Sequence, residues 1–189
     1  MELLDIRDLN GRTTGEVKDR KKVHEEGDVH GTSHVFILRE NQEDPGGLPE
    51  LLLQKRSEGK DSFPGCYDIS SAGHIPAGDD YLESAIRELE EELGIKAVPE
   101  ELTFIGFHEG YAKETFYGRP FINHEISKVY IYTGSVDIKK LKLQKEEVEA
   151  VKWMGLQECL EKVRKGDPAY ILFPGELKMI EKYWRTQRA

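Results

Sequence analysis

Three glutamates recur at a spacing that brings their carboxylates to one side of a helix. Glu88, Glu91 and Glu92 stand at positions i, i+3 and i+4, and residues three and four apart are neighbours on a helix surface. Like charges at this spacing destabilise an isolated helix, and a bound cation would offset the repulsion. Carboxylate oxygens are hard ligands that suit Mg²⁺ or Mn²⁺. The spacing therefore indicates a divalent-metal site, although the same glutamates alone would also fit a solvated acidic helix face.

An apolar stripe on the same segment predicts how these carboxylates are held in place. Apolar residues recur there at spacings of four, three and four: Leu82, Ile86, Leu89 and Leu93. Asp79 or Asp80 can cap the start of a helix, and Gly94 follows as its stop. We therefore expect a helix over residues 80–93, with its apolar side in the core and its acidic side over a cleft. Arg87, the only basic residue of this helix, can orient a carboxylate through two hydrogen bonds.

The segment from Gly73 to Ile95 resembles the Nudix box. That signature reads Gly, five residues, Glu, seven residues, Arg-Glu-apolar-any-Glu-Glu-any-Gly-apolar, and the chain matches eight of its nine fixed positions. The exception is Asp79, where the family has Glu, so one supporting carboxylate is a methylene shorter. The resemblance implies a loop–helix–loop over residues 73–95.

The resemblance also implies a role for each charged residue of the box. Glu91 and Glu92 would be the main metal ligands, Glu88 would be a further ligand or the base, and the Gly73 carbonyl could also coordinate. With Arg87, these glutamates would form the catalytic set of a Mg²⁺- or Mn²⁺-dependent hydrolase. Such an enzyme cleaves a diphosphate bond in a nucleoside diphosphate derivative or a related organic diphosphate, by attack of a metal-activated water on phosphorus. The implied partner is therefore a small-molecule diphosphate.

Motifs outside the box resemble the Nudix branch that includes isopentenyl-diphosphate isomerase and its hydrolase relatives. They run in order: His24-Glu-Glu-Gly-Asp-Val-His30-Gly-Thr-Ser-His34-Val-Phe-Ile, then Leu53-Gln-Lys-Arg56, then Phe63-Pro-Gly-Cys-Tyr-Asp-Ile-Ser-Ser-Ala-Gly-His74. By that resemblance, His30, His74 and Glu125 match a second metal site, whose imidazole and carboxylate groups suit Mn²⁺ or Zn²⁺. Asn123 replaces one of its carboxylates, and His24 stands one residue out of register for a further ligand. These histidines could equally be structural or contact the substrate.

One position argues against isomerase activity. In the isomerase that the chain resembles, a cysteine just before a Gly-His pair protonates the alkene, whereas here Ala72 precedes Gly73 and His74. Cys66 would lie roughly 20 Å away along an extended strand. The chain also keeps all three box glutamates. That isomerase matches the box less well at these positions, and a catalytically silent binding module would be expected to lose them. An isomerase and a silent binding module on the same fold are thus the alternatives to a hydrolase.

Cations and aromatic side chains outside the box are candidates for holding the rest of the substrate. Lys55, Arg56 and Lys60 could bind phosphate oxygens, or could be solvated ends of a strand and a loop. Four aromatic residues flank a loop that contains Gly and Lys, and they could stack a base or a thiazole ring or simply fold over the core: Tyr111, Phe116, Tyr117 and Phe121.

Composition narrows the class of protein. The chain has 189 residues, of which 38% are apolar and 33% charged, with a net charge of −9, which fits one domain over residues 1–189. It shows no basic stripe for a nucleic acid polymer, no apolar run of the roughly 20 residues that span a membrane, and no signal-peptide pattern. Two distant cysteines suggest neither a zinc site nor a disulfide framework. We therefore expect a cytoplasmic enzyme, whose oligomeric state stays open with a homodimer as one alternative.

The order of strand and helix patterns predicts the fold class. It indicates an α+β fold, an α/β/α sandwich with a mixed β-sheet between helices, which the Nudix resemblance also implies. The turn dipeptide Asn10-Gly11 predicts a hairpin over residues 2–17, within an N-terminal extension at residues 1–28. Further strands are expected over residues 34–38, 50–56, 67–72, 102–107, 126–133 and 148–154. Helices are expected over residues 156–165 and 174–185, within a C-terminal segment at residues 156–189.

Overall fold

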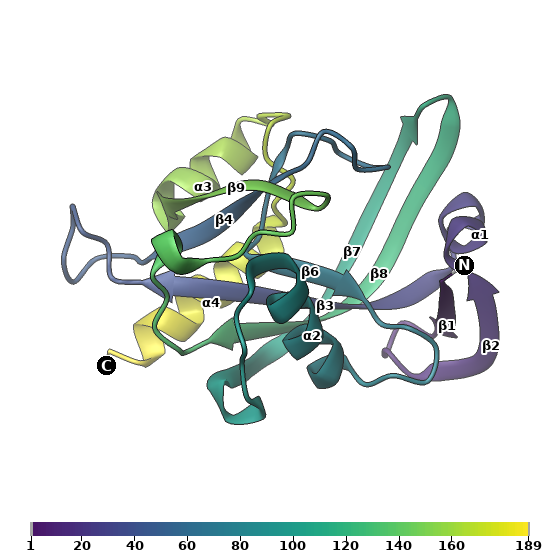
Figure 1. Ribbon diagram of the computed structural model, residues 1–189, viewed down its shortest axis with the longest axis horizontal. Coiled ribbons are helices and arrows are strands. Elements are labelled where there is room, and N and C mark those ends of the chain that lie inside the picture. The colour runs from purple at the N-terminus through teal and green to yellow at the C-terminus, as the bar shows by residue number, and fades with distance from the viewer. Residues whose placement is uncertain (1, 189) are drawn as a thin grey trace.

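A curved mixed β-sheet with helices on both faces forms the body of the molecule (Figure 1). The computed structural model describes residues 2–188, and within them the sheet has nine strands. The strands are β1 (Leu3–Arg7), β2 (Thr13–Asp19), β3 (Val29–Arg39), β4 (Glu50–Arg56), β5 (Tyr67–Asp68), β6 (Ser71–His74), β7 (Leu102–Phe116), β8 (Arg119–Tyr132) and β9 (Val148–Gly155). The helices are α1 (Arg20–Glu26), α2 (Tyr81–Leu93), α3 (Leu156–Arg164) and α4 (Pro174–Thr186), with short 3₁₀ turns at Pro99–Glu101 and Ile138–Lys140. None of these helices is long and apolar enough to cross a membrane.

Strand β3 is the centre of the sheet and separates two hydrophobic cores. It pairs antiparallel with β1, β4 and β6 and parallel with β8. Successive side chains of a strand point to opposite faces. Val35 and Ile37 accordingly pack with α2, whereas Phe36 packs with α3 and α4. The box helix and the C-terminal helices therefore lie on opposite faces, which confirms the predicted sandwich with an added N-terminal hairpin.

Helix α2 begins and ends where its flanking residues predicted. The Asp80 carboxylate accepts a hydrogen bond from the Leu82 amide at 2.8 Å and caps the helix. Gly94 ends the helix in the left-handed region at φ 72°, a conformation that glycine adopts without strain. Leu89 and Leu93 are fully buried against the sheet. The acidic side of the helix is thereby turned away from the core.

Residues 102–132 form one long hairpin, which corrects the expected loop between two short strands. Strands β7 and β8 pair from Leu102↔Tyr132 to Phe116↔Arg119, with one shift in register between Phe104 and Gly106, and project beyond the body of the sheet (Figure 1). The two residues between them, Tyr117 and Gly118, have φ of 51° and 75°, the positive angles of a type I′ turn. Gly118 adopts this conformation readily but Tyr117 does not, so the usual dipeptide signal for the turn is incomplete.

Two smaller differences lie near the box. The polar stretch at residues 18–27 contains a helix, α1, which is capped by Asp19. The predicted strand at residues 67–72 is interrupted, because β5 pairs with β4 and β6 pairs with β3. Ser70 lies at the crossing, where its hydroxyl donates to Leu52 O at 2.6 Å and accepts from Ile37 N at 2.8 Å. The chain thus changes strand partner just before the box begins.

A buried ion pair fastens α4 to β3. His34 Nδ1 lies 2.7 Å from Glu176 Oε1, and both side chains are almost fully enclosed. Burial disfavours the charged imidazole, but the neighbouring carboxylates of Glu176 and Glu125 outweigh it and raise the pKa of His34 to about 9. His34 is therefore charged at neutral pH and holds the first turn of α4.

The pH dependence of unfolding tests this pair. Because the pKa of His34 rises from 6.5 to about 9 on folding, its contribution to stability is fully present below pH 6.5 and is lost as pH rises toward 9. We expect Glu176→Gln to lower the free energy of unfolding by about 3 kcal/mol near pH 6, and by clearly less near about pH 9.5, in urea titrations. Glu181→Gln on the same helix is the control and should change it by less than about 0.5 kcal/mol. An effect of Glu176→Gln that is equal at both pH values would contradict a charged pair.

Candidate active site

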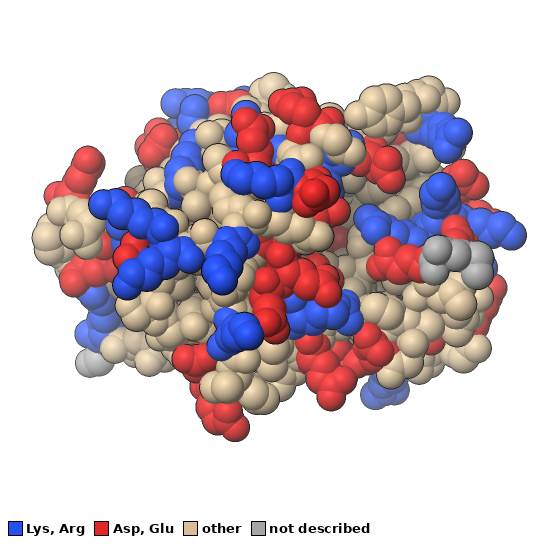
Figure 2. Space-filling model, viewed as in Figure 1, with Lys and Arg blue, Asp and Glu red and all other residues tan. Residues whose placement is uncertain are grey.

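A cavity of about 740 Å³ opens beside the acidic side of α2. Its wall includes Glu88, Glu91 and Glu92 from α2 and Gly73 from β6. Residues of α1, β3, β7, β8 and the loop after β4 also line it, as do residues 144, 147 and 171–173. Figure 2 shows acidic side chains gathered in the middle of this face, over α2 and beside a hollow. The structure thus brings the three carboxylates and Gly73 together at one cavity.

Arg87 and Gly73 position the carboxylate of Glu88. The Arg87 guanidinium donates to Asp79 Oδ2 at 3.0 Å and to Glu88 Oε1 at 3.2 Å. Asp79 therefore reaches Arg87 although it is shorter than the glutamate of the box signature. A Cβ at Gly73 would overlap the Glu88 side chain, so only glycine lets β6 run this close to α2. Burial raises the pKa of Glu88.

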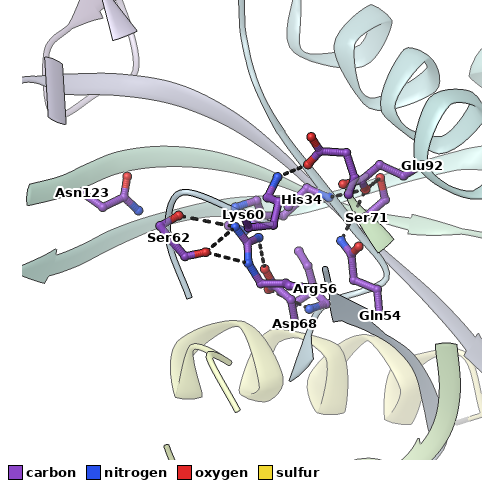
Figure 3. Close-up of polar contacts among 12 residues, drawn as sticks. His34, Gln54, Arg56, Lys60, Ser62, Asp68, Ser71, Glu92 and Asn123 are labelled. Atoms are coloured by element: carbon purple, nitrogen blue, oxygen red, sulfur yellow. Dashed lines mark hydrogen bonds and ion pairs between the residues drawn. The ribbon is translucent and has the colours of Figure 1, made fainter. Parts of the chain in front are cut away.

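Glu92 is almost enclosed and is held by donors from two strands. Its Oε2 accepts from Ser71 Oγ at 2.7 Å and, at 3.4 Å each, from Gln54 Nε2 and the Ala72 amide (Figure 3). Only 5% of the residue is exposed, and burial raises its pKa to about 8. Sequence reasoning did not find Ser71 and Gln54 because neither stands in the box, and β4 and β6 approach Glu92 only in the folded sheet.

The donor set fits a hard divalent cation. All three glutamates line the cavity, but their exposure to solvent differs. Glu92 is buried, Glu88 is half-buried and Glu91 is exposed. Burial makes the charged forms of Glu88 and Glu92 unfavourable. A divalent cation would offset that cost directly, since opposite charge favours ionised carboxylates.

A second cluster in the same cavity consists of three imidazoles. One ring nitrogen from each of His24, His30 and His74 lies within 4.8 Å of the others, and His24 Nε2 and His74 Nε2 are 3.3 Å apart. His30 Nε2 is buried and has no hydrogen-bond partner among residues 2–188. Burial lowers the pKa of all three, that of His24 to about 3. Neutral imidazoles are the form that binds metal ions.

The structure places the members of the expected second site differently from one another. His30 and His74 lie together, and α1 places His24 beside them. The position of His24 in the sequence, one residue out of register, does not by itself predict that it joins the cluster. Glu125 also lines the cavity, but its carboxylate accepts from Asn123 Nδ2 at 2.8 Å and lies 3.5 Å from His34 Nε2. Glu125 therefore stands beside the cluster rather than within it.

The three candidate phosphate-binding cations are separated. Arg56 and Lys60 line the cavity, where Arg56 pairs with Asp68 at 3.1 Å and Lys60 pairs with Glu147 (Figure 3). Lys55 does not line the cavity and pairs with Glu149 at 3.0 Å.

Arg20 of α1 is a further cation in the cavity wall. It pairs with Glu2 at 2.8 Å. Sequence reasoning missed Arg20 because α1 was not expected.

The aromatic candidates also divide between wall and surface. Phe121 lines the cavity together with Phe63, and Phe116 packs on Phe63 with ring centroids 4.8 Å apart. Tyr111 and Tyr117 are exposed. Of the four aromatic residues considered from the sequence, only Phe121 therefore lines the cavity.

Ala72 lines the cavity directly before Gly73 and His74 and offers only a methyl group. Cys66 does not line the cavity, and its thiol donates to Pro168 O at 3.5 Å. Among residues 2–188, no thiol therefore faces the place where an isomerase would need one.

Known proteins resemble this chain in sequence and in structure. It is 44% identical over 174 residues to Nudix hydrolase 3 of Arabidopsis thaliana, covering 90% of this chain and 21% of that protein. It is 42% identical over 147 residues to an uncharacterized Nudix hydrolase of Clostridium acetobutylicum, covering 78% of this chain and 66% of that protein. The chain therefore spans less than two thirds of the length of either relative.

Solved structures share the fold. DR0079 from Deinococcus radiodurans superposes with a TM-score of 0.64 at 19% identity, covering 94% of this chain and 98% of that chain. The NUDIX domain of Shewanella oneidensis NrtR, complexed with ADP ribose, gives a TM-score of 0.54 at 17% identity, covering 84% and 88%. The model of the NUDIX domain family matches residues 29–172. The model covers most of the chain and both relatives are named Nudix hydrolases, so the chain belongs to the NUDIX domain family.

Proposed function

We propose that this hydrolase depends on Mg²⁺ or Mn²⁺ and cleaves the diphosphate bond of a nucleoside diphosphate derivative or a related organic diphosphate. The observation that carries the proposal is the convergence of Glu88, Glu91 and Glu92 on one cavity that also holds cations. Arg56 and Lys60 line that cavity with the glutamates. A diphosphate needs both features, because its charge must be neutralised and the attacking water must be activated.

Each residue of the box has a task in this proposal. Glu88, Glu91 and Glu92 hold the metal, with the Gly73 carbonyl as a further donor, and the metal supplies water activation and charge neutralisation. Arg87 keeps the Glu88 carboxylate aimed at the cavity. Their rigid support means that little reorganisation is needed during the reaction.

The residues around Glu92 and the cavity cations complete the site. Ser71 and Gln54 fix the orientation of Glu92. Arg56 and Lys60 bind phosphate oxygens, for which each exchanges its present carboxylate partner. Until the substrate binds, these carboxylate partners keep the charges of Arg56 and Lys60 paired.

The two alternatives are less consistent with the site. Isomerisation requires a proton donor where Ala72 offers a methyl group. A silent binding module has no need of a buried carboxylate such as Glu92, whose pKa is raised to about 8 by burial. A panel of diphosphates incubated with Mg²⁺ and with Mn²⁺ and assayed for the two phosphate-bearing products of diphosphate cleavage separates the three, since only the hydrolase forms them.

We also propose a second metal site in the same cavity. His24, His30 and His74 supply three neutral nitrogens, and Glu125 beside them is the adjacent carboxylate expected from the sequence. Nitrogen-rich sites suit Mn²⁺ or Zn²⁺ better than Mg²⁺. The unpartnered Nε2 of the buried His30 supports this proposal, since buried polar atoms without partners are uncommon.

Replacing Glu92 by Gln tests the hydrolase. The change keeps size and hydrogen bonding but removes a ligand charge, so we expect kcat to fall by at least about 10²-fold. The stability of the metal-free protein should stay equal or rise, because burial already disfavours the charged form of Glu92. Glu90→Gln is the matched control, since Glu90 is exposed on the same helix and should leave kcat unchanged. Full activity of Glu92→Gln on the best substrate would remove the box from the mechanism.

Replacing Gly73 by Ala tests the close contact between β6 and α2. The added methyl group overlaps the Glu88 side chain, so we expect kcat to fall by at least about tenfold and stability by about 1–3 kcal/mol. Gly59→Ala is the control, because a Cβ there meets only Ser57 Oγ at 3.5 Å. Steady-state kinetics and thermal unfolding of both variants give the comparison. Equal kinetics for Gly73→Ala and the wild type would show that Glu88 is not held as described.

Metal analysis tests the histidine cluster. After incubation with Zn²⁺ and removal of loosely bound ions, elemental analysis should find one equivalent that is lost in His30→Asn and in His24→Asn. His124→Asn is the control, because His124 pairs with Glu109 outside the cluster. Zinc retained by both cluster variants would show that the three imidazoles are structural.

A further inference from the structure

A second cavity, of about 640 Å³, shares no lining residue with the first. It lies between the β1–β2 hairpin, the loop at residues 78–80 and the β7–β8 hairpin. The loop connects the two places, because Asp79 lines this cavity while its partner Arg87 lines the first. Nothing in the proposed hydrolysis uses this cavity.

Two cations of this cavity lack carboxylate partners. Arg7 and Lys128 approach the ring of Tyr81 at 4.7 and 4.8 Å from its centroid, and neither forms an ion pair with any carboxylate of residues 2–188. Arg7 is only 8% exposed, and its Nε has no partner within the same residues. Arg7 Nη1 donates to Gly11 O at 2.9 Å, but no carboxylate of the described residues neutralises the charge of this buried guanidinium.

The carboxylates of the cavity are engaged elsewhere. Asp5 accepts from the Gly78 amide at 2.9 Å. Asp80 caps α2, and Asp79 pairs with Arg87. The exposed guanidinium of Arg12 adds a third cation to the same wall. Because Asp79 is neutralised by Arg87, the three cations of the wall face two carboxylates, those of Asp5 and Asp80, and the cavity keeps a small excess of positive charge on a chain whose net charge is −9.

An irregularity in β7 places aromatic rings beside these cations. The strand register shifts between Phe104 and Gly106, where Gly106 has φ 147°. Residues three apart on a regular strand face opposite sides, but the bulge brings Phe104 and Phe107 to the same side, 5.9 and 5.8 Å from Lys128 Nζ. Phe107 lines the cavity and is 51% exposed. Bulges commonly re-aim side chains at functional sites, and exposed aromatic patches mark binding sites.

We propose that this cavity binds an organic anion that joins a planar ring to a phosphate group, as a nucleoside monophosphate does. Lys128 and Arg12 bind the phosphate, and the buried guanidinium of Arg7 adds positive charge in the cavity wall. The exposed face of Phe107 receives the ring. The proposal does not depend on hydrolysis at the first cavity.

Binding of AMP to the metal-free protein in EDTA tests this site. Calorimetry should show saturable binding of AMP, with ribose 5-phosphate and adenosine each at least about fivefold weaker because each lacks one half of the ligand. In ¹⁵N spectra, the amides of Gly11, Gly78 and Phe107 should shift while that of Gly73 does not. No AMP binding, or shifts centred on Gly73, would overturn the proposal.

Substitutions separate this site from other cationic surfaces. Lys128→Met and Phe107→Ala should each weaken AMP binding by at least about fivefold. Lys139→Met is the control, since Lys139 lines neither cavity, and it should bind AMP as the wild type does. Thermal unfolding confirms that each variant is folded before it is titrated. Folded Lys128→Met and Phe107→Ala variants with wild-type affinity would overturn the proposal.

Discussion

The burial of one carboxylate shapes the wall of the candidate active-site cavity. Glu92 lies at the last turn of α2, where only 5% of it reaches solvent, and an enclosed carboxylate must find donors or a cation. Ser71 of β6 and Gln54 of β4 supply donors. Those two strands have to meet beside α2, and the crossing of the chain at Ser70 brings them there. The crossing at Ser70 and the position of α2 therefore both contribute to the enclosure of this single side chain.

The periodic features of the site could be predicted from sequence because they are local. The apolar repeat of α2, its cap at Asp80 and its stop at Gly94 depend on neighbours within a few residues. The spacing of Glu88, Glu91 and Glu92 fixes their shared side by helix geometry alone. Gly73 could be marked by the box signature, but the reason for glycine there, contact with Glu88, needs the sheet and helix together.

The remaining features depend on contacts between distant segments. Helix α1 is short and polar, so no apolar repeat marks it, yet it carries His24 and Arg20 into the cavity wall. The β7–β8 hairpin turns at Tyr117, a residue that rarely has positive φ, and the sequence therefore does not predict a hairpin turn there. Lys55 and Arg56 are adjacent in sequence, but the register of β4 against β9 shifts between them, and only Arg56 lines the cavity while Lys55 pairs with Glu149.

The parallel pairing of β3 with β8 has a consequence for the order in which the chain folds. Thr32 and Ser127, whose hydroxyls are hydrogen-bonded at 2.8 Å, are 95 positions apart. Closing a loop of that length costs chain entropy before the contacts between β3 and β8 can stabilise the pairing. Pairing of β3 with β6 spans a much shorter loop and brings α2 with it. During synthesis, the acidic wall can therefore assemble on β3 before β8 has left the ribosome. In that order of assembly, the three glutamates of α2 come together before the opposite wall, with Phe121, has formed.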